Sequence, residues 1–289
     1  MGFRINTNVD ALNAYNSLAR VNKETATAQL KIASGKRINN VADDTSGFNI
    51  GKSLEGKVTV MKAAQNNVSS AKNLLSTAEG ALLSSNDLLI KIEGKISDAT
   101  NPTADRDAIA KDIKALATEM QSVLNTTKFN NTNLLTGAGD AKAGFVFQVG
   151  LYDKNNASSE KITLDFAQAI LSGSSSGFNT SLGNIMSVTE TSMTTSATIT
   201  SLQANLASLK TEVTSALGKI GNFTQRLDIK EETLNVSITN AQSSYSRLFD
   251  ADMAAEQLNA TRGSLLGQAA TAMLSQLNSA PQSVMSLFR

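Results

Sequence analysis

Two series of apolar residues at seven-residue intervals constrain this chain more than any other feature. Seven-residue spacing returns to the same helix face every two turns, which is typical of a seam between helices that pack side by side. The sequence therefore predicts two long helices, each with one buried stripe. The first series is Leu54, Met61, Val68, Leu75, Leu82, Leu89 and Ile96, and the second is Ile199, Leu206, Val213, Ile220, Leu227, Leu234, Ala241 and Leu248.

The residues beside the first seam indicate how closely a partner helix approaches. Ala64, Ala71 and Ala78 each follow a seam residue by three positions, and such small side chains permit close packing. Neither helix can bury its own apolar stripe, so we expect the two long helices to pair antiparallel and bury both stripes between them. Asn101-Pro102 ends the first helix, and a shorter third helix follows. Independent helices in separate domains are the alternative.

Between the two seams the pattern changes to short runs rich in β-forming residues. Phe145–Val149 and Lys161–Phe166 are flanked by Gly, Asn and Ser, which predicts strands of a small sheet or hairpin. Residues 172–198 are rich in Ser, Thr and Gly, so we expect an exposed loop. The predicted fold class is mainly α: a long antiparallel helical rod with a small β-hairpin and with paired N- and C-terminal helices.

The two ends of the chain are also amphipathic, but their apolar stripes are narrow and rich in alanine. Helices of this kind are marginal until they dock, so we expect their partners to lie in neighbouring copies of the chain. The residues predicted to form this self-assembly core are Ile5, Val9, Leu12, Leu258, Leu265, Ala269, Met273, Leu277, Val284 and Leu287.

Composition excludes most kinds of chemistry. The 289 residues include no His and no Cys, which removes the commonest general base, thiolate catalysis and most zinc sites. With a net charge of +1, the chain has no strong positive electrostatic potential that would attract nucleic acid or anionic lipid. No apolar run suits a cleaved signal peptide or a membrane span. We therefore expect neither an enzyme nor a cofactor or metal site, and neither a nucleic-acid nor a membrane partner.

Two short motifs imitate catalytic or binding sites. Gly47–Ser53 resembles a phosphate-binding loop, but only three residues separate its glycines where that loop needs four. Asp43 and Asp44 leave a carboxylate-dependent hydrolase as a remote alternative. The simpler interpretation is a helix break followed by an N-cap in which Asp44, Thr45 or Ser46 accepts free amides of the next helix.

Several longer motifs together resemble those of bacterial flagellins. They lie in the same order as in that family and span both ends of the chain and most of its first half. They are Ile5–Asn8, Leu12–Ala14, Ala33–Asn39, Ala42–Gly47, Thr77–Leu82, Lys128–Leu135, Ser246–Glu256, Gln268–Asn278 and Pro281–Leu287.

The resemblance implies a structural subunit that polymerises into the extracellular flagellar filament for swimming motility. It implies an inner domain of terminal helices (1–44 and 246–289), a helical outer domain with the hairpin (45–171 and 199–245) and an exposed loop (172–198). The implied partners are other copies of the chain, hook-junction and cap proteins, an export chaperone and the type III export apparatus. A hook-filament junction protein is the alternative of the same architecture.

Two further expectations concern the outer domain. In the family, a Toll-like receptor grips the stretch that aligns with Leu89–Lys95, where Lys91, Glu93, Gly94 and Lys95 replace the usual Arg, Arg, Glu and Leu. The resemblance therefore implies weak or absent recognition by that receptor. The hydroxyl-rich loop is also a candidate for O-linked glycans, at Ser174, Ser175, Ser176, Thr191 and Ser192.

Overall fold

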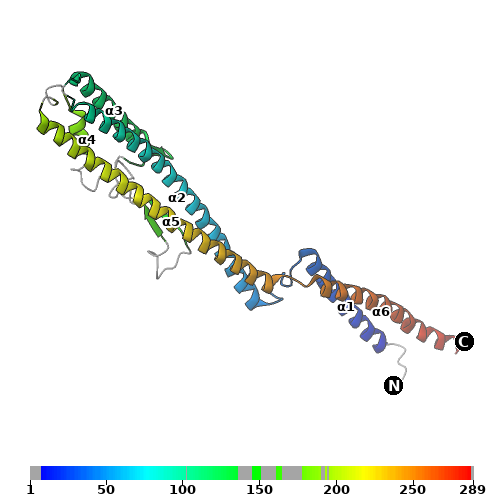
Figure 1. The fold of residues 1–289 in the computed structure, drawn as a ribbon. Coiled ribbons are helices and arrows are strands. Elements are labelled where there is room, and N and C mark those ends of the chain that lie inside the picture. The colour runs from blue at the N-terminus through cyan, green and yellow to red at the C-terminus, as the bar shows by residue number, and fades with distance from the viewer. Residues whose placement is uncertain are drawn as a thin grey trace. The chain divides into compact units, whose positions relative to one another are not determined.

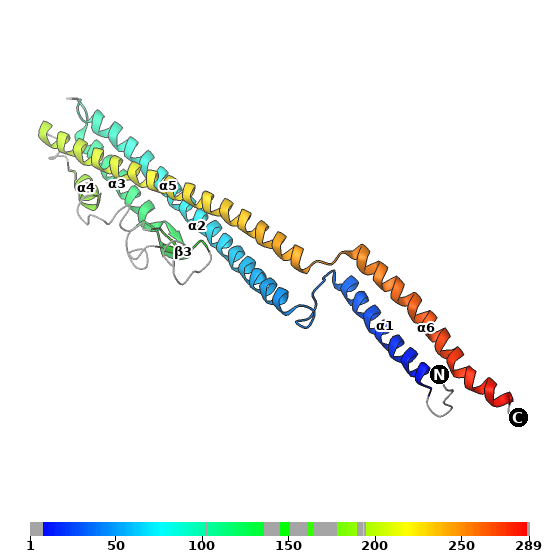
Figure 2. The ribbon, with the colours of Figure 1, turned by 90° about the horizontal axis from the view of Figure 1, so that it is seen from below.

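The computed structural model describes residues 8–101, 103–135, 145–150, 161–164, 178–189, 193 and 195–287, with the side chains of 196 and 280–287 excepted. The chain divides into two compact units, one formed by residues 1–58 and 239–289 and the other by residues 59–238. Figures 1 and 2 show the elements of each unit as ribbons.

The first unit contains the paired terminal helices α1 (Val9–Ser34) and α6 (Met253–Leu287). α1 begins at the N-cap Asn8, whose side chain accepts a hydrogen bond from the Ala11 amide, and ends at Gly35, which adopts φ 67°. A left-handed residue after a helix suits glycine because it has no Cβ. Asp252 caps α6 by accepting the amides of Ala254 and Ala255.

Two long helices, α2 (Thr45–Asp98) and α5 (Ser196–Phe249), contribute residues to both units. In the second unit the two helices run antiparallel, because the side-chain contacts between them join later residues of α2 to earlier residues of α5. The Gln65 amide donates to the Asn235 side chain at 2.8 Å, Lys72 bridges Asp228 and Glu231, and Lys210 lies 2.7 Å from Glu93.

The heptad seams of α2 and α5 form most of the core of the second unit. Ala64, Ala71 and Ala78, the small residues beside the first seam, are buried too. Leu54, Ala241 and Leu248, at the ends of the series, are half-buried. The buried seam residues are Met61, Val68, Leu75, Leu82, Leu89 and Ile96 in α2, and Ile199, Leu206, Val213, Ile220, Leu227 and Leu234 in α5.

A third helix, α3 (Arg106–Thr126), begins at the N-cap Asp105 and buries Ile113, Ala117 and Met120. It packs against the short helix α4 (Phe178–Met186). The expectation of an exposed loop over 172–198 is wrong for α4, because Phe178, Leu182 and Ile185 are buried. Their spacing of four and three residues makes one apolar helix face, which the average Ser/Thr content of the segment conceals.

Two small antiparallel sheets lie among the described residues of the second unit. β1 (Lys128–Phe129) pairs with β2 (Thr132–Asn133) around Asn130 and Asn131, which both adopt positive φ, as in the favoured two-residue hairpin turn. β3 (Phe145–Gln148) pairs with β4 (Lys161–Leu164), so that Phe145 faces Leu164. The predicted fold class, mainly α with paired helices and a small hairpin, is confirmed. The predicted domain boundaries near 44 and 245 fall inside the first unit and stay a prediction.

Candidate assembly surfaces

The inner faces of α1 and α6 hold the two helices together. The Asn8 side chain donates to the Leu277 carbonyl at 3.1 Å at one end of the pair, and Lys31 lies 3.4 Å from Glu256 at the other. Between them the helices approach closely: a Cβ on Gly263 would lie 2.2 Å from the Thr25 hydroxyl oxygen. The pairing is therefore antiparallel and tight.

This pairing buries little apolar surface. Ala28 is the buried residue of α1, and Ala260 is the buried residue among the described side chains of α6. Because burial of apolar area supplies most of the stability of a helix pair, two alanines stabilise this one weakly. The described part of the pair therefore leaves most of its apolar surface for other contacts.

The residues predicted to form the self-assembly core lie mainly on the outward faces of these helices. Leu12 is 59% exposed, Leu258 67% and Leu265 62%, values unusual for leucine. Leu277 is half-buried. Ile5 lies outside the described residues, and so do the side chains of Val284 and Leu287. The other exposed members of the set are Val9, Ala269 and Met273.

Each terminal helix carries an outward apolar series at seven-residue intervals, opposite its buried alanine. In α1 the series is Leu12, Ala19 and Ala26, and in α6 it is Leu258, Leu265 and Ala272, all exposed. Four further large side chains of these helices, Tyr15, Leu30, Met253 and Leu266, are exposed but were not predicted. Tyr15 and Leu30 lie three or four residues from the outward series, a spacing that could have found them. Met253 and Leu266 do not have that spacing, and Leu266 lines the groove between the two helices.

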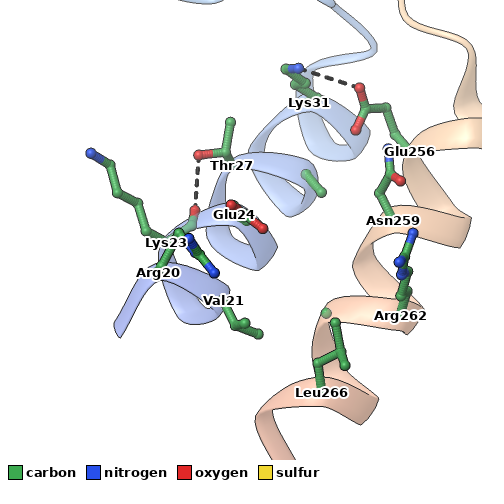
Figure 3. A pocket seen from close by; sticks show the side chains of 12 residues that line it. Arg20, Val21, Lys23, Glu24, Thr27, Lys31, Glu256, Asn259, Arg262 and Leu266 are labelled. Atoms are coloured by element: carbon green, nitrogen blue, oxygen red, sulfur yellow. Dashed lines mark hydrogen bonds and ion pairs between the residues drawn. The ribbon is translucent and has the colours of Figure 1, made fainter. Parts of the chain in front are cut away.

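One side of the α1–α6 pair is polar and hollow. A groove of about 740 Å³ lies between the two helices, and Figure 3 shows Arg20 and Glu24 on α1 facing Asn259 and Arg262 on α6. The Lys31–Glu256 ion pair closes one end of it. Charged walls of this kind favour water over apolar partners, so the groove is a poor surface for helix docking.

The two connections that lead out of the terminal helices are bonded to each other. The Arg37 amide donates to the Phe249 carbonyl at 2.6 Å, and the Ala251 amide donates to the Gly35 carbonyl at 3.0 Å. Lys36 and Asp250 form the isolated antiparallel bridge between these bonds. Main-chain bonds on both sides of the bridge fix the register of α1 against α6.

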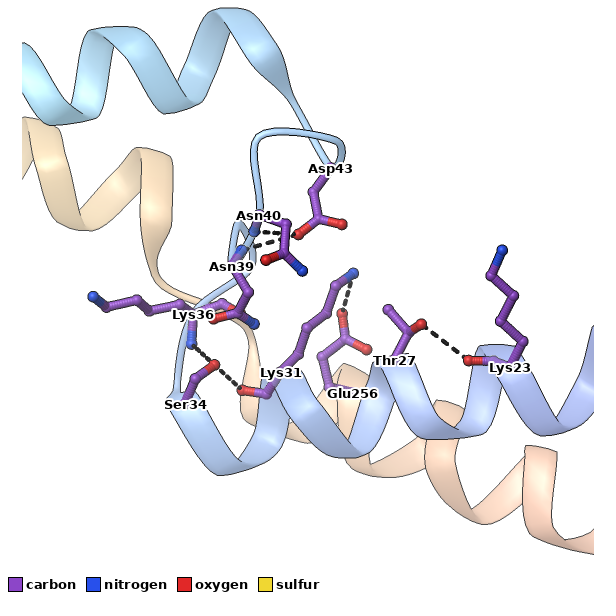
Figure 4. A network of polar contacts seen from close by, with 9 residues as sticks. All are labelled: Lys23, Thr27, Lys31, Ser34, Lys36, Asn39, Asn40, Asp43 and Glu256. Atoms are coloured by element: carbon purple, nitrogen blue, oxygen red, sulfur yellow. Dashed lines mark hydrogen bonds and ion pairs between the residues drawn. The ribbon is translucent and has the colours of Figure 1, made fainter.

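The carboxylates that suggested a hydrolase both have structural partners in this connection. Asp43 accepts the amides of Asn39 and Asn40 at 3.0 and 2.9 Å, as Figure 4 shows. Asp44 accepts the Gly47 amide at 2.9 Å and so caps α2, which confirms the N-cap interpretation. Both carboxylates therefore bind backbone amides at the start of α2.

A pH dependence follows from Asp43. The backbone hydrogen bonds from Asn40 and Asn39 lower the pKa of this carboxyl below its ordinary value of 3.8. The stabilisation is therefore fully present above about pH 4 and is lost as the pH falls through the lower folded pKa. We expect Asp43→Asn to lower the melting temperature of the monomer at pH 7, with the gap to the unaltered chain closing below pH 3.8. A gap independent of pH in calorimetric scans would refute this assignment.

The Phe249 ring packs directly against α2 at Gly51. A Cβ at position 51 would lie 1.8 Å from the ring carbon Cε2, so no other residue fits without moving the ring. Phe249 also stacks on Tyr245, with ring centroids 4.6 Å apart. The glycine therefore lets α2 and the end of α5 approach within the first unit.

This contact gives a matched pair of substitutions in α2. Gly51→Ala is expected to destabilise the monomer by about 1–3 kcal/mol through overpacking against Phe249. Gly56→Ala meets no atom within 4 Å and should stabilise the helix by up to about 1 kcal/mol. Urea unfolding followed by circular dichroism measures both, and equal effects of the two substitutions would contradict the proposed role of Gly51.

The stretch aligned with the receptor motif lies on α2 in the second unit. Leu89 is buried in the seam, whereas Lys91, Glu93 and Gly94 are exposed. Glu93 pairs with Lys210 of α5. Lys95 lies 2.7 Å from Asp112 of α3, and this hydrogen bond raises the pKa of its amine. Glu93 and Lys95 therefore tie α2 to its neighbours within the chain.

Other expected features fall partly outside the structure. The five candidate glycan positions, Ser174, Ser175, Ser176, Thr191 and Ser192, are not among the described residues. In the described ranges no helix has the length and apolarity to cross a membrane. Within the same ranges, no three metal-ligating side chains gather.

A tightly paired set of long helices that leaves two apolar faces uncovered is the architecture of a self-assembling structural subunit. Comparison with known proteins agrees with this class. Residues 5–140 match the bacterial flagellin N-terminal helical region, and residues 204–288 match the bacterial flagellin C-terminal helical region. The chain belongs to the bacterial flagellin family.

Individual relatives cover nearly the whole chain. It is 30% identical to the flagellin of Bacillus subtilis, with 99% of this chain and 100% of the relative covered. It is 31% identical to the flagellin of Halalkalibacterium halodurans, with 99% of each covered. A solved structure described as a flagellar hook-associated protein of Vibrio parahaemolyticus shares the fold, with TM-score 0.56 and 14% identity over 72% of this chain and 100% of that one.

Proposed function

We propose that this filament subunit polymerises through the outward apolar faces of α1 and α6, with the α1 face of one copy against the α6 face of the next. The observation that carries the proposal is the pair of exposed seven-residue series, Leu12–Ala19–Ala26 and Leu258–Leu265–Ala272. Two different faces meeting head to tail make a heterologous contact, which repeats without closing into a dimer. Repetition of such a contact around an axis builds a helical tube.

Membership of the flagellin family supports the same arrangement, because the family's members are subunits of the extracellular flagellar filament. The narrow inner contact of α1 with α6 supports it as well, since the terminal helices gain most of their burial only when copies meet. The domain organisation proposed with it is an inner domain of terminal helices (1–44 and 246–289) and an outer domain (45–171 and 199–245).

Assembly of the purified chain tests this function. Monomer seeded with short filament fragments is expected to grow into long filaments that sediment and are visible by electron microscopy. A junction protein of the same architecture would add only a short layer to the seeds. Failure of the full chain to elongate any seed, at concentrations up to the millimolar range, would reject the filament proposal.

The proposed partners beyond the polymer are the type III export apparatus, an export chaperone, and the cap and hook-junction proteins. The absence of cysteine supports export as an unfolded chain, because no disulfide can trap it on the way. Secretion of the chain by cells that lack the export apparatus would argue against this route. O-glycans on the serine- and threonine-rich segment are also proposed, and an intact mass equal to that of the bare chain would remove them.

Weak recognition by the Toll-like flagellin receptor is proposed from the exposed positions of α2. Lys91 cannot make the bidentate contact of an arginine, and Gly94 offers no side chain. Glu93 and Lys95 are held by ion pairs with Lys210 and Asp112, which a receptor would have to break. Restoring Arg, Arg, Glu and Leu at the four altered positions, 91 and 93–95, is expected to raise signalling by receptor-bearing cells at least tenfold. Strong signalling by the unaltered monomer would contradict the proposal.

A further inference from the structure

Two methionines of α6 differ from the other methionines in their exposure. Met273 is 64% exposed and Met253 is 46% exposed. The other methionines with described side chains are buried or half-buried: Met61, Met120, Met186 and Met193. An apolar side chain that is nearly two-thirds exposed gains little from packing within its own copy. What distinguishes methionine from leucine at such a position is the thioether sulfur, which oxidants convert to a sulfoxide.

The composition of the chain directs oxidants such as hydrogen peroxide to methionine. The chain contains no Cys, so no thiol competes for the oxidant, and it contains neither Trp nor His. Exposure then decides among the methionines, because the oxidant has to reach the sulfur lone pair. Among the described side chains, Met273 therefore offers the most accessible sulfur.

Met273 also lies on a face that the proposed function buries. Leu265, Ala269 and Met273 follow one another at four-residue intervals, and side chains spaced in this way form one ridge along a helix. All three are exposed in the single copy, and Leu265 belongs to the outward series of α6. An oxygen atom added to Met273 would therefore enter an apolar contact between copies.

We propose that Met273 is an oxidation site that controls whether a free subunit can join the filament, an inference that rests on the proposed filament function. The sulfur lone pair attacks one oxygen atom of hydrogen peroxide, and the O–O bond breaks. The hydroxide that leaves takes the proton of the transferred hydroxyl group and departs as water. The sulfur is thereby oxidised by two electrons to the sulfoxide, and the peroxide is reduced by two electrons.

The sulfoxide impairs assembly without unfolding the subunit. Its oxygen is a hydrogen-bond acceptor that water satisfies in the free copy, because Met273 is exposed there. Covering the ridge removes that water, and an apolar face offers no donor in its place. The modification is reversible, since methionine sulfoxide reductases restore the thioether. Assembled subunits are protected, because the neighbouring copy shields the sulfur.

Peptide mass mapping after brief treatment with hydrogen peroxide tests the site itself. In the full-length monomer, Met273 is expected to gain oxygen at least about tenfold faster than the buried Met120. In filaments, Met273 should react at least about tenfold more slowly than in the monomer. Equal rates at Met273 and Met120 in the monomer would overturn the site, and equal rates at Met273 in monomer and filament would overturn its protection by assembly.

The effect on assembly is measured as the critical concentration for elongation of seeds, before and after peroxide, so that each chain is its own reference. The unaltered chain should show a rise of at least about tenfold. The control Met253→Leu removes the other exposed sulfur, about 30 Å away along α6, and should show the same rise. Met273→Leu keeps an apolar side chain without sulfur, so its rise should stay below about threefold.

Two further measurements separate the sulfoxide from general damage. Met273→Gln places a polar group of similar length on the ridge and should have a raised critical concentration without any peroxide. Reductases for both sulfoxide epimers should return the oxidised unaltered chain to its untreated value. Circular dichroism should show that the oxidised monomer keeps its helicity.

The same measurements can contradict the inference. An equal rise for Met273→Leu and the unaltered chain overturns the assignment to Met273, and so does normal assembly of subunits whose Met273 is fully oxidised. Failure of the untreated, unaltered chain to elongate seeds would instead reject the proposed function.

Discussion

Filaments are expected to be lost when Leu265 is replaced by aspartate. Leu265 is 62% exposed in the monomer but lies at the centre of the outward α6 series, where the proposed interface buries it. A charge without a partner in such an interface costs several kcal/mol, and about 3 kcal/mol corresponds to roughly a hundredfold higher critical concentration. Sedimentation of seeded monomer over a range of concentrations measures this quantity.

A matched control separates the interface from a general effect of charge. Asn259→Asp introduces the same charge into the same helix, but on the wall of the polar groove beside Arg262. Its critical concentration is expected to stay within about threefold of the unaltered chain, because a hydrated surface charge is worth less than about 1 kcal/mol. Both variants should keep the helicity of the monomer. Equal loss of assembly in both would show that the outward face of α6 is not the interface.

The buried seams were the most predictable part of this molecule. A residue such as Leu82 or Leu227 recurs at seven-residue spacing because the same physical requirement, burial against an antiparallel partner, acts at every second turn. The caps were predictable for a similar reason. Asp44 precedes a helix whose first amides have no internal acceptor, and a short carboxylate side chain fits that need locally.

Features that depend on long-range contacts were harder to predict. Gly51 looked like part of an imitation phosphate loop, and only the position of Phe249, nearly two hundred residues away, explains why a glycine stands there. α4 was hidden because serine and threonine dominate the surrounding segment 172–198, in which Phe178, Leu182 and Ile185 form a single short apolar face. The outward faces of α1 and α6 were predicted only in part. An apolar pattern indicates which residues are buried, but it does not indicate whether they pack against the same copy of the chain or against another.

Adjacent leucines in α2 are expected to separate monomer stability from filament stability. Leu82 is fully buried in the seam, while Leu83 beside it is 48% exposed. Leu82→Ala should destabilise the monomer by about 2–5 kcal/mol, because it removes buried methyl groups and leaves a cavity in the core. Leu83→Ala removes the same atoms from a solvated face and should change monomer stability by less than about 1 kcal/mol. Urea unfolding of each monomer measures the two effects.

The filament is expected to reverse this order of sensitivity, because the exposed side chain of Leu83 is open to contact with a neighbouring copy. Filaments of Leu83→Ala, whose monomer is intact, should dissociate at a lower temperature than unaltered filaments, because every neighbour contact loses one apolar side chain. Filaments of Leu82→Ala that do form should keep their contacts between copies, since Leu82 is buried within its own copy. Filaments of Leu83→Ala as heat-resistant as the unaltered ones would show that Leu83 stays solvated after assembly. A weakened Leu83→Ala monomer would show that this leucine supports the fold instead.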